Sequence, residues 1–122
     1  MFRLWIAIDL FVVLVFVAIG RSVHDHRINV AGLTSTAWPF VIGVSVGWLI
    51  LVALGRVGTT VTDGVIVSVV TVSIGMLLRI VGGQGIALPF VLVALGFLGA
   101  FMLGWRIVLR GLRHVRTNRT TA

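Results

Sequence analysis

Residues 71–106 read TVSIGMLLRIVGGQGIALPFVLVALGFLGAFMLGWR, and this stretch decides the fold class. It contains an apolar run closed by Arg79, a glycine-rich turn, and a second apolar run that opens near Pro89 and closes on Trp105-Arg106. Because almost none of these side chains favours water, the stretch predicts two membrane helices joined by a short turn.

The composition of the whole chain extends this interpretation. Of its 122 residues, 59% are hydrophobic and 11% are charged, and the mean hydropathy is +1.19. A soluble domain of this length could not cover that much apolar surface, so lipid is the expected solvent. The absence of cysteine excludes disulfides, zinc–thiolate sites and thiol catalysis. The net charge of +7 comes from arginines that flank apolar runs, which indicates membrane topology and not nucleic-acid binding.

Four apolar runs predict an all-α bundle of four transmembrane helices, at about residues 4–21, 38–55, 64–81 and 86–109. In hydrocarbon every backbone polar group needs an internal partner, so these runs form helices even where valine is abundant. Pro39 and Pro89 are expected in the first turn of the second and fourth helices, where a missing N–H has no cost. Residues 1–110 form the transmembrane domain, and residues 111–122 form a basic, partly disordered tail.

The first run also resembles a cleavable signal peptide. Its positive region is a single residue, Arg3, and Asp9 interrupts its apolar region. An uncleaved first helix is therefore the favoured interpretation.

Two short matches indicate an internal repeat. Residues 15–20 (VFVAIG) resemble residues 70–75 (VTVSIG), and Pro39-Phe40 recurs as Pro89-Phe90. The chain is then a duplicated helical hairpin, although short matches in a valine-rich sequence also arise by chance.

The distribution of arginine predicts the orientation. With four spans, the N-terminus, the middle loop and the tail share one side of the membrane. That side carries Arg3, Arg56, Arg106, Arg110, Arg113, Arg116 and Arg119, and the other carries Arg21, Arg27 and Arg79. The excess places both termini in the cytoplasm of a multi-pass protein of the cell membrane. Trp5 and Trp105 then lie at the inner interface, whereas Trp48 falls within a span and is a packing residue.

Five segments together resemble one small membrane-protein family. They are Gly20-Arg21 with His24, Pro39-Phe40, Gly75-Met76 with Leu78-Arg79, Gly83-Gln84-Gly85, and Leu103-Gly104-Trp105-Arg106. The family is a domain of unknown function, number 3054, known from actinobacteria and other prokaryotes. The resemblance covers nearly the whole chain and implies a four-helix integral membrane protein, and it carries no activity to any residue.

Asp9 is a candidate ion or proton site. A carboxylate at this depth in a span costs up to about 2.5–3.5 kcal/mol, so it is expected to face the bundle or a water-filled cavity. The competing interpretation is an interface aspartate near the start of its helix, favoured by the helix dipole.

A candidate anion or solute site lies at the predicted outer face. It would combine Arg21, His24 and Arg79 with the free N–H groups of Gly83, Gln84 and Gly85. The competing interpretation is that interfacial arginines reach lipid phosphates and the glycines permit a tight turn. The motif His24-Asp25-His26 supplies too few converging ligands for a metal, and no metal or cofactor is expected.

Small residues on two helices predict close helix packing. Gly43 and Gly47 form a GxxxG motif on the second helix, and Gly96, Ala100 and Gly104 form a stripe on the fourth. Such faces bring helices together within one bundle or between copies, and two of them in a short chain favour a homo-oligomer.

Arginines also recur at helical spacing after the fourth apolar run. Arg106, Arg110, Arg113 and Arg116 would form a lipid-facing basic surface against anionic inner-leaflet lipid if the helix continues. The same arginines equally serve as the topology signal.

Two functions are nearly level from the sequence. The first is a small-solute or ion transporter or channel component that works as an oligomer. The second is a non-transporting accessory subunit that contacts another membrane protein, for which Asp9→Asn is expected to be tolerated. An enzyme ranks last because no catalytic constellation is present, and it would require Asp9 and His24, expected at opposite faces, to lie close together.

Overall fold

The computed structural model describes residues 2–23, 30–83 and 88–121 and contains four helices over these residues. They are α1 (Phe2–Val23), α2 (Val30–Ala53), α3 (Val61–Val81) and α4 (Leu88–Thr121). Each is long and apolar enough to cross a membrane, so the predicted all-α, multi-pass membrane architecture is confirmed.

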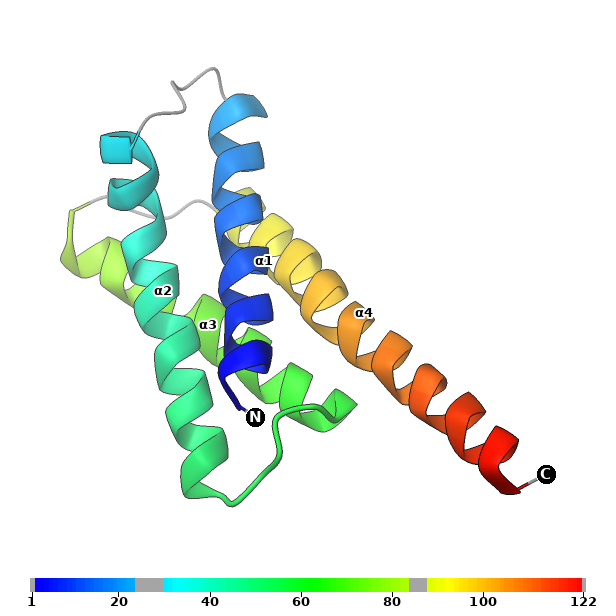
Figure 1. Cartoon of the computed structure of the whole chain (residues 1–122). Coiled ribbons are helices and arrows are strands. Elements are labelled where there is room, and N and C mark those ends of the chain that lie inside the picture. The colour runs from blue at the N-terminus through cyan, green and yellow to red at the C-terminus, as the bar shows by residue number, and fades with distance from the viewer. Residues whose placement is uncertain (1, 24–29, 84–87, 122) are drawn as a thin grey trace.

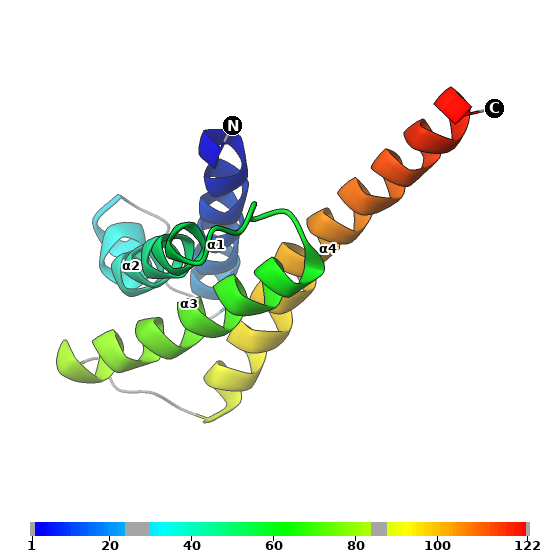
Figure 2. The same cartoon turned by 90° about the horizontal axis from the view of Figure 1, so that it is seen from below.

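The helices form a ring in which α1 contacts α2, α2 contacts α3, α3 contacts α4, and α4 returns to α1. The most extensive interface joins α2 to α3. α1 and α2 run in opposite directions, α3 lies across α2, and the C-terminal half of α4 projects away from the other helices (Figures 1 and 2). The end of the bundle where α1 begins, α2 ends and α3 begins is named the Asp9 end.

Glycine permits the close approach of α2 and α3. A Cβ atom at Gly43 would lie 2.6 Å from the carbonyl oxygen of Thr71, and one at Gly47 would lie 3.3 Å from the Cα of Val67. At Gly75, a Cβ would lie 2.7 Å from the ring of Phe40. Gly43 and Gly47 therefore lie where α2 and α3 approach each other closely.

An aromatic cluster fills the centre of the bundle. Phe16 of α1 lies 5.6 Å from Phe40 of α2 in an edge-to-face arrangement, and 5.9 Å and 5.4 Å from Phe90 and Phe97 of α4. These are favourable separations for aromatic pairs, so the cluster joins three helices without any polar group.

Two helix starts differ from the prediction. α2 begins at Val30, so Pro39 lies inside the helix and not in its first turn. Proline is tolerated within membrane helices when packing and nearby hydroxyl groups compensate for the missing bond, and Pro39 is fully buried. α3 begins at Val61 because Thr60 and Asp63 form a capping box, in which each side chain accepts a hydrogen bond from the other residue's N–H.

The C-terminal boundary of α4 is also later than predicted. The helix continues to Thr121 through the segment expected to be a partly disordered tail. The duplication remains a prediction, and the unequal positions of Pro39 and Pro89 in their helices give it no support.

Candidate functional site

A buried ion pair between α1 and α4 forms the polar centre of the Asp9 end. The Arg106 Nη2 atom donates to Asp9 Oδ2 at 2.7 Å, and Arg106 Nη1 donates to Asp9 Oδ1 at 3.1 Å. Both side chains have 0% solvent exposure. Two parallel charge-assisted bonds of this kind are the favourable geometry for an arginine–carboxylate pair.

Two tryptophans complete the hydrogen bonding of the carboxylate. Trp48 on α2 donates its Nε1–H to Asp9 Oδ2 at 2.9 Å, and Trp105 on α4 donates its Nε1–H to Asp9 Oδ1 at 2.9 Å. Each carboxylate oxygen thus accepts two bonds, one from arginine and one from tryptophan. This saturation offsets part of the cost of removing a charge from water.

The remaining donors of Arg106 bind backbone carbonyls. Its Nε–H donates to the Gly58 carbonyl at 2.9 Å, and Nη1 also donates to the Met102 carbonyl at 2.9 Å. The guanidinium lies 4.3 Å from the ring of Trp105, and Trp5 stacks on that ring at 5.4 Å. Because Gly58 belongs to the α2–α3 loop, this one side chain joins α4, α1 and the loop.

A second carboxylate, that of Asp63, also binds the α2–α3 loop. Asp63 on α3 accepts hydrogen bonds from the N–H groups of Gly58 and Thr60 and from the side chain of Arg56, with which it forms an ion pair. Asp63 is fully buried, whereas the Arg56 side chain is 37% exposed. Gly58 therefore donates its N–H to Asp63 and accepts a hydrogen bond from Arg106 through its carbonyl.

Arg106 corrects one sequence prediction. It was expected to belong to a lipid-facing basic surface, but it points into the bundle and is fully buried. Its burial follows from Asp9, because charged groups inside a membrane pair with one another wherever the fold allows. Arg110, Arg113 and Arg116 are exposed further along α4.

The small-residue stripe on α4 differs from the one on α2. A Cβ atom at Gly96 or at Gly104 would meet nothing within 4 Å among the described residues, and Ala100 is exposed. Among the described residues, no other helix approaches the glycines of this stripe closely, in contrast to Gly43 and Gly47. Its predicted contact with a second copy stays a prediction.

The predicted outer site is only partly within the described residues. His24, Gln84, Gly85 and the side chain of Arg21 lie outside them. Arg79 is half-buried, and its guanidinium lies 4.8 Å from the ring of Phe90. Gly83 is exposed with φ 77°, a conformation that glycine adopts without strain. The assignment of an anion to this site stays a prediction.

Sequence reasoning missed the pairing of Asp9 with Arg106, although the signal was present. Both residues were placed near the same predicted membrane face, on helices expected to be antiparallel. Asp9 is the acid of the first span, and Arg106 is the first base after the fourth apolar run. Treating Arg106 as a topology signal concealed its partnership, and the loop contact through Gly58 had no sequence signal.

Comparison with known proteins identifies the family of the chain. No curated protein and no solved structure matches the chain. The model of one family, described as a protein of unknown function (DUF3054), matches residues 6–109, which is most of the chain. The family resemblance drawn from the sequence is thereby confirmed, and this chain with its four candidate membrane spans belongs to the DUF3054 family.

Proposed function

We propose that the protein is a non-transporting, non-enzymatic accessory subunit of a larger membrane complex. The single observation that carries this proposal is the closed Asp9–Arg106 pair. Both oxygens of the carboxylate are occupied, both side chains have 0% exposure, and each buried side-chain polar atom of the described residues has a partner. An ion or proton site needs a path by which it can be reached, and the Asp9 side chain is fully enclosed in this arrangement.

The exposed surface of α4 supports a role in contacting other proteins. Its apolar residues Leu92, Val93 and Phe101 are exposed, and no helix of the described chain covers Gly96 or Ala100. Small residues on an open face let a neighbouring helix approach closely, which stabilises association in lipid. The partner in this proposal is another membrane protein or a second copy of the chain, in the cell membrane with both termini in the cytoplasm.

Accessibility of the polar centre tests the proposal. The chain has no cysteine, so a single Val13→Cys variant carries one thiol. Val13 is fully buried, lies one helical turn from Asp9, and leaves the ion pair intact. We expect this thiol to resist a charged, membrane-impermeant thiol reagent from either side until the protein is denatured. Arg116→Cys, on the exposed part of α4, is the reactive control.

Transport by an oligomer is the second candidate, because charged residues inside a span commonly mark ion or solute pathways. It requires the ion pair to open during a cycle. If Val13→Cys reacts in the native membrane while the ion pair remains formed at rest, the accessory proposal fails. Ion and proton flux into proteoliposomes should then be measured with the wild type and Asp9→Asn.

A further inference from the structure

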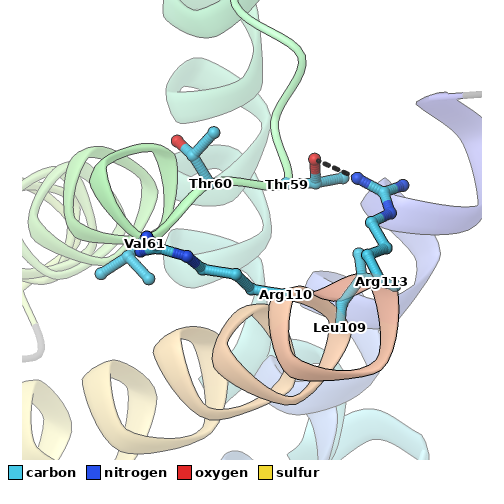
Figure 3. Close-up of a pocket in the computed structure, with 6 residues that line it drawn as sticks. All are labelled: Thr59, Thr60, Val61, Leu109, Arg110 and Arg113. Atoms are coloured by element: carbon cyan, nitrogen blue, oxygen red, sulfur yellow. Dashed lines mark hydrogen bonds between the residues drawn. The ribbon is translucent and has the colours of Figure 1, made fainter. Parts of the chain in front are cut away.

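A hollow lies between the start of α3 and the part of α4 that leaves the bundle. Its volume is about 240 Å³, and it is lined by Thr59, Thr60, Val61, Leu109, Arg110 and Arg113. Figure 3 shows the two arginine side chains reaching from α4 toward residues 59–61. The hollow is separate from the Asp9–Arg106 pair, and none of its lining residues takes part in that pair.

The charge of the hollow favours an anion. Two of its six lining residues are arginines and none is acidic. The nearby carboxylate of Asp63 is fully buried and is directed to Arg56, Gly58 and Thr60. Asp63 therefore places no negative charge directly inside the hollow.

The polar groups of the hollow are also suitably placed for a phosphate. The Thr59 hydroxyl lies 3.5 Å from Arg113 Nη1, so a hydroxyl and a guanidinium face the same space. α3 begins at Val61, and the amino end of a helix carries partial positive charge. Arginine binds phosphate oxygens through a planar pair of N–H groups, which gives both attraction and direction.

The surroundings favour a lipid as the source of that phosphate. Val61 and Leu109 form apolar walls, and Val108 and Leu112 are exposed on the same segment of α4. α4 leaves the bundle here, at the Asp9 end (Figure 1), and basic residues near the end of a membrane helix attract anionic headgroups. A polar hollow beside exposed apolar side chains matches an amphiphile with a phosphate head and acyl chains.

We propose that this hollow binds the phosphate group of one anionic phospholipid, held by Arg110, Arg113 and the Thr59 hydroxyl. The proposal differs from a diffuse attraction between basic residues and an anionic leaflet, because it assigns unequal roles to arginines of the same helix. Arg110 and Arg113 line the hollow, whereas Arg116 does not. It does not depend on the accessory role proposed above.

Native mass spectrometry of delipidated protein in detergent tests the site, with phosphatidylglycerol as the added probe and phosphatidylcholine as the reference lipid. We expect one tightly retained phosphatidylglycerol per chain. Arg110→Gln and Arg113→Gln should each weaken retention about five- to tenfold, as expected for the loss of one charge-assisted contact. Arg116→Gln, which removes the same charge from the same helix, should change retention less than about twofold.

Thr59→Val separates a built site from simple charge. It leaves the net charge unchanged and removes the hydroxyl, so weaker retention in this variant supports direct coordination, and unchanged retention contradicts it. Equal losses for Arg110→Gln, Arg113→Gln and Arg116→Gln would overturn the proposal in favour of diffuse attraction. Displacement of the lipid by millimolar inorganic phosphate would overturn the lipid assignment and leave a free-phosphate site. Circular dichroism and size-exclusion chromatography verify that each variant is folded, and Thr59→Val carries the test if an arginine variant is not.

Discussion

At the scale of single residues, the cost of a buried charge explains the design of the Asp9 end. Asp9 and Arg106 would each be costly alone in a membrane span. Here Asp9 accepts hydrogen bonds from Arg106 and two indole N–H groups, and Arg106 donates to Asp9 and to two backbone carbonyls. The sequence indicates that both residues lie near the same membrane face, but they are separated by nearly the whole chain, and no local pattern links them. Periodicity identified the helices that carry them but not which faces meet.

Replacing Asp9 should therefore destabilise the protein. Asp9→Asn turns one accepting oxygen into an NH₂ donor that faces the donors of Arg106 and a tryptophan, and it leaves the arginine charge unpaired. We expect the free energy of unfolding to fall by about 3 kcal/mol, measured by denaturant unfolding in detergent micelles. This expectation replaces the tolerance of Asp9→Asn that the sequence alone had suggested for an accessory subunit.

The double variant Asp9→Leu with Arg106→Met is the control for that result. Removing both charges leaves no unpaired group, so we expect the double variant to be more stable than either Asp9→Leu or Arg106→Met. Additive losses would show that the two residues act independently and would contradict the pairing.

Gly58 is the residue at which the loop and the polar centre meet. It has φ 89°, and a Cβ added there would lie 2.3 Å from Cη2 of Trp48. The indole cannot move aside freely because its N–H binds Asp9. We expect Gly58→Ala to lower the free energy of unfolding by at least about 2 kcal/mol. Gly55→Ala has a similar φ of 71° but meets nothing within 4 Å, so it should show only the backbone strain of about 1 kcal/mol. Equal losses in the two variants would contradict the steric argument.

At the scale of helices, the two small-residue faces behave differently, and glycine spacing alone could not distinguish them. Gly43 lies against the backbone of Thr71, whereas Gly96 meets no described atom within 4 Å. The GxxxG pattern indicates that a helix face permits close packing, but the tertiary arrangement decides whether another helix packs against that face. Likewise, Pro39 suggested a helix start, although the helix extends nine residues before it. The capping residues Thr60 and Asp63 were visible in the sequence and would have placed the start of α3 correctly.

Alanine substitutions test this difference between the two helices. Gly43→Ala places a Cβ 2.6 Å from a backbone oxygen that cannot rotate away, so α2 and α3 must separate. We expect a loss of about 1–3 kcal/mol in the free energy of unfolding. Gly96→Ala should be neutral or slightly stabilising for the isolated chain, because alanine favours helix over glycine. A larger loss for Gly96→Ala would reveal a contact made by another copy of the chain.

At the scale of the whole molecule, the number and type of the helices followed from composition and hydropathy, because lipid leaves helices as the solution for an isolated apolar run. The packing of the helices did not follow from the sequence, because nothing in the pattern of residues 61–81 requires α3 to lie across α2. The orientation is a separate question, and it depends on arginine counts. Because Arg106 is buried in an ion pair, it no longer counts as an exposed topology signal. The predicted cytoplasmic side then has one arginine fewer to count, but it still has more than the other side.

Single-cysteine labelling tests the orientation directly. Val57→Cys, at an exposed position of the α2–α3 loop, and Arg116→Cys on α4 should react with an impermeant thiol reagent after cell lysis and not in intact cells. Gly83→Cys, at the opposite end of α3, should react in intact cells, and the strain of its positive φ is small enough for a loop position to bear. The reverse pattern would place the termini outside the cell. The proposed phosphate site would then face the outer leaflet, and the arginines of α4 would have been retained for lipid binding and not for topology.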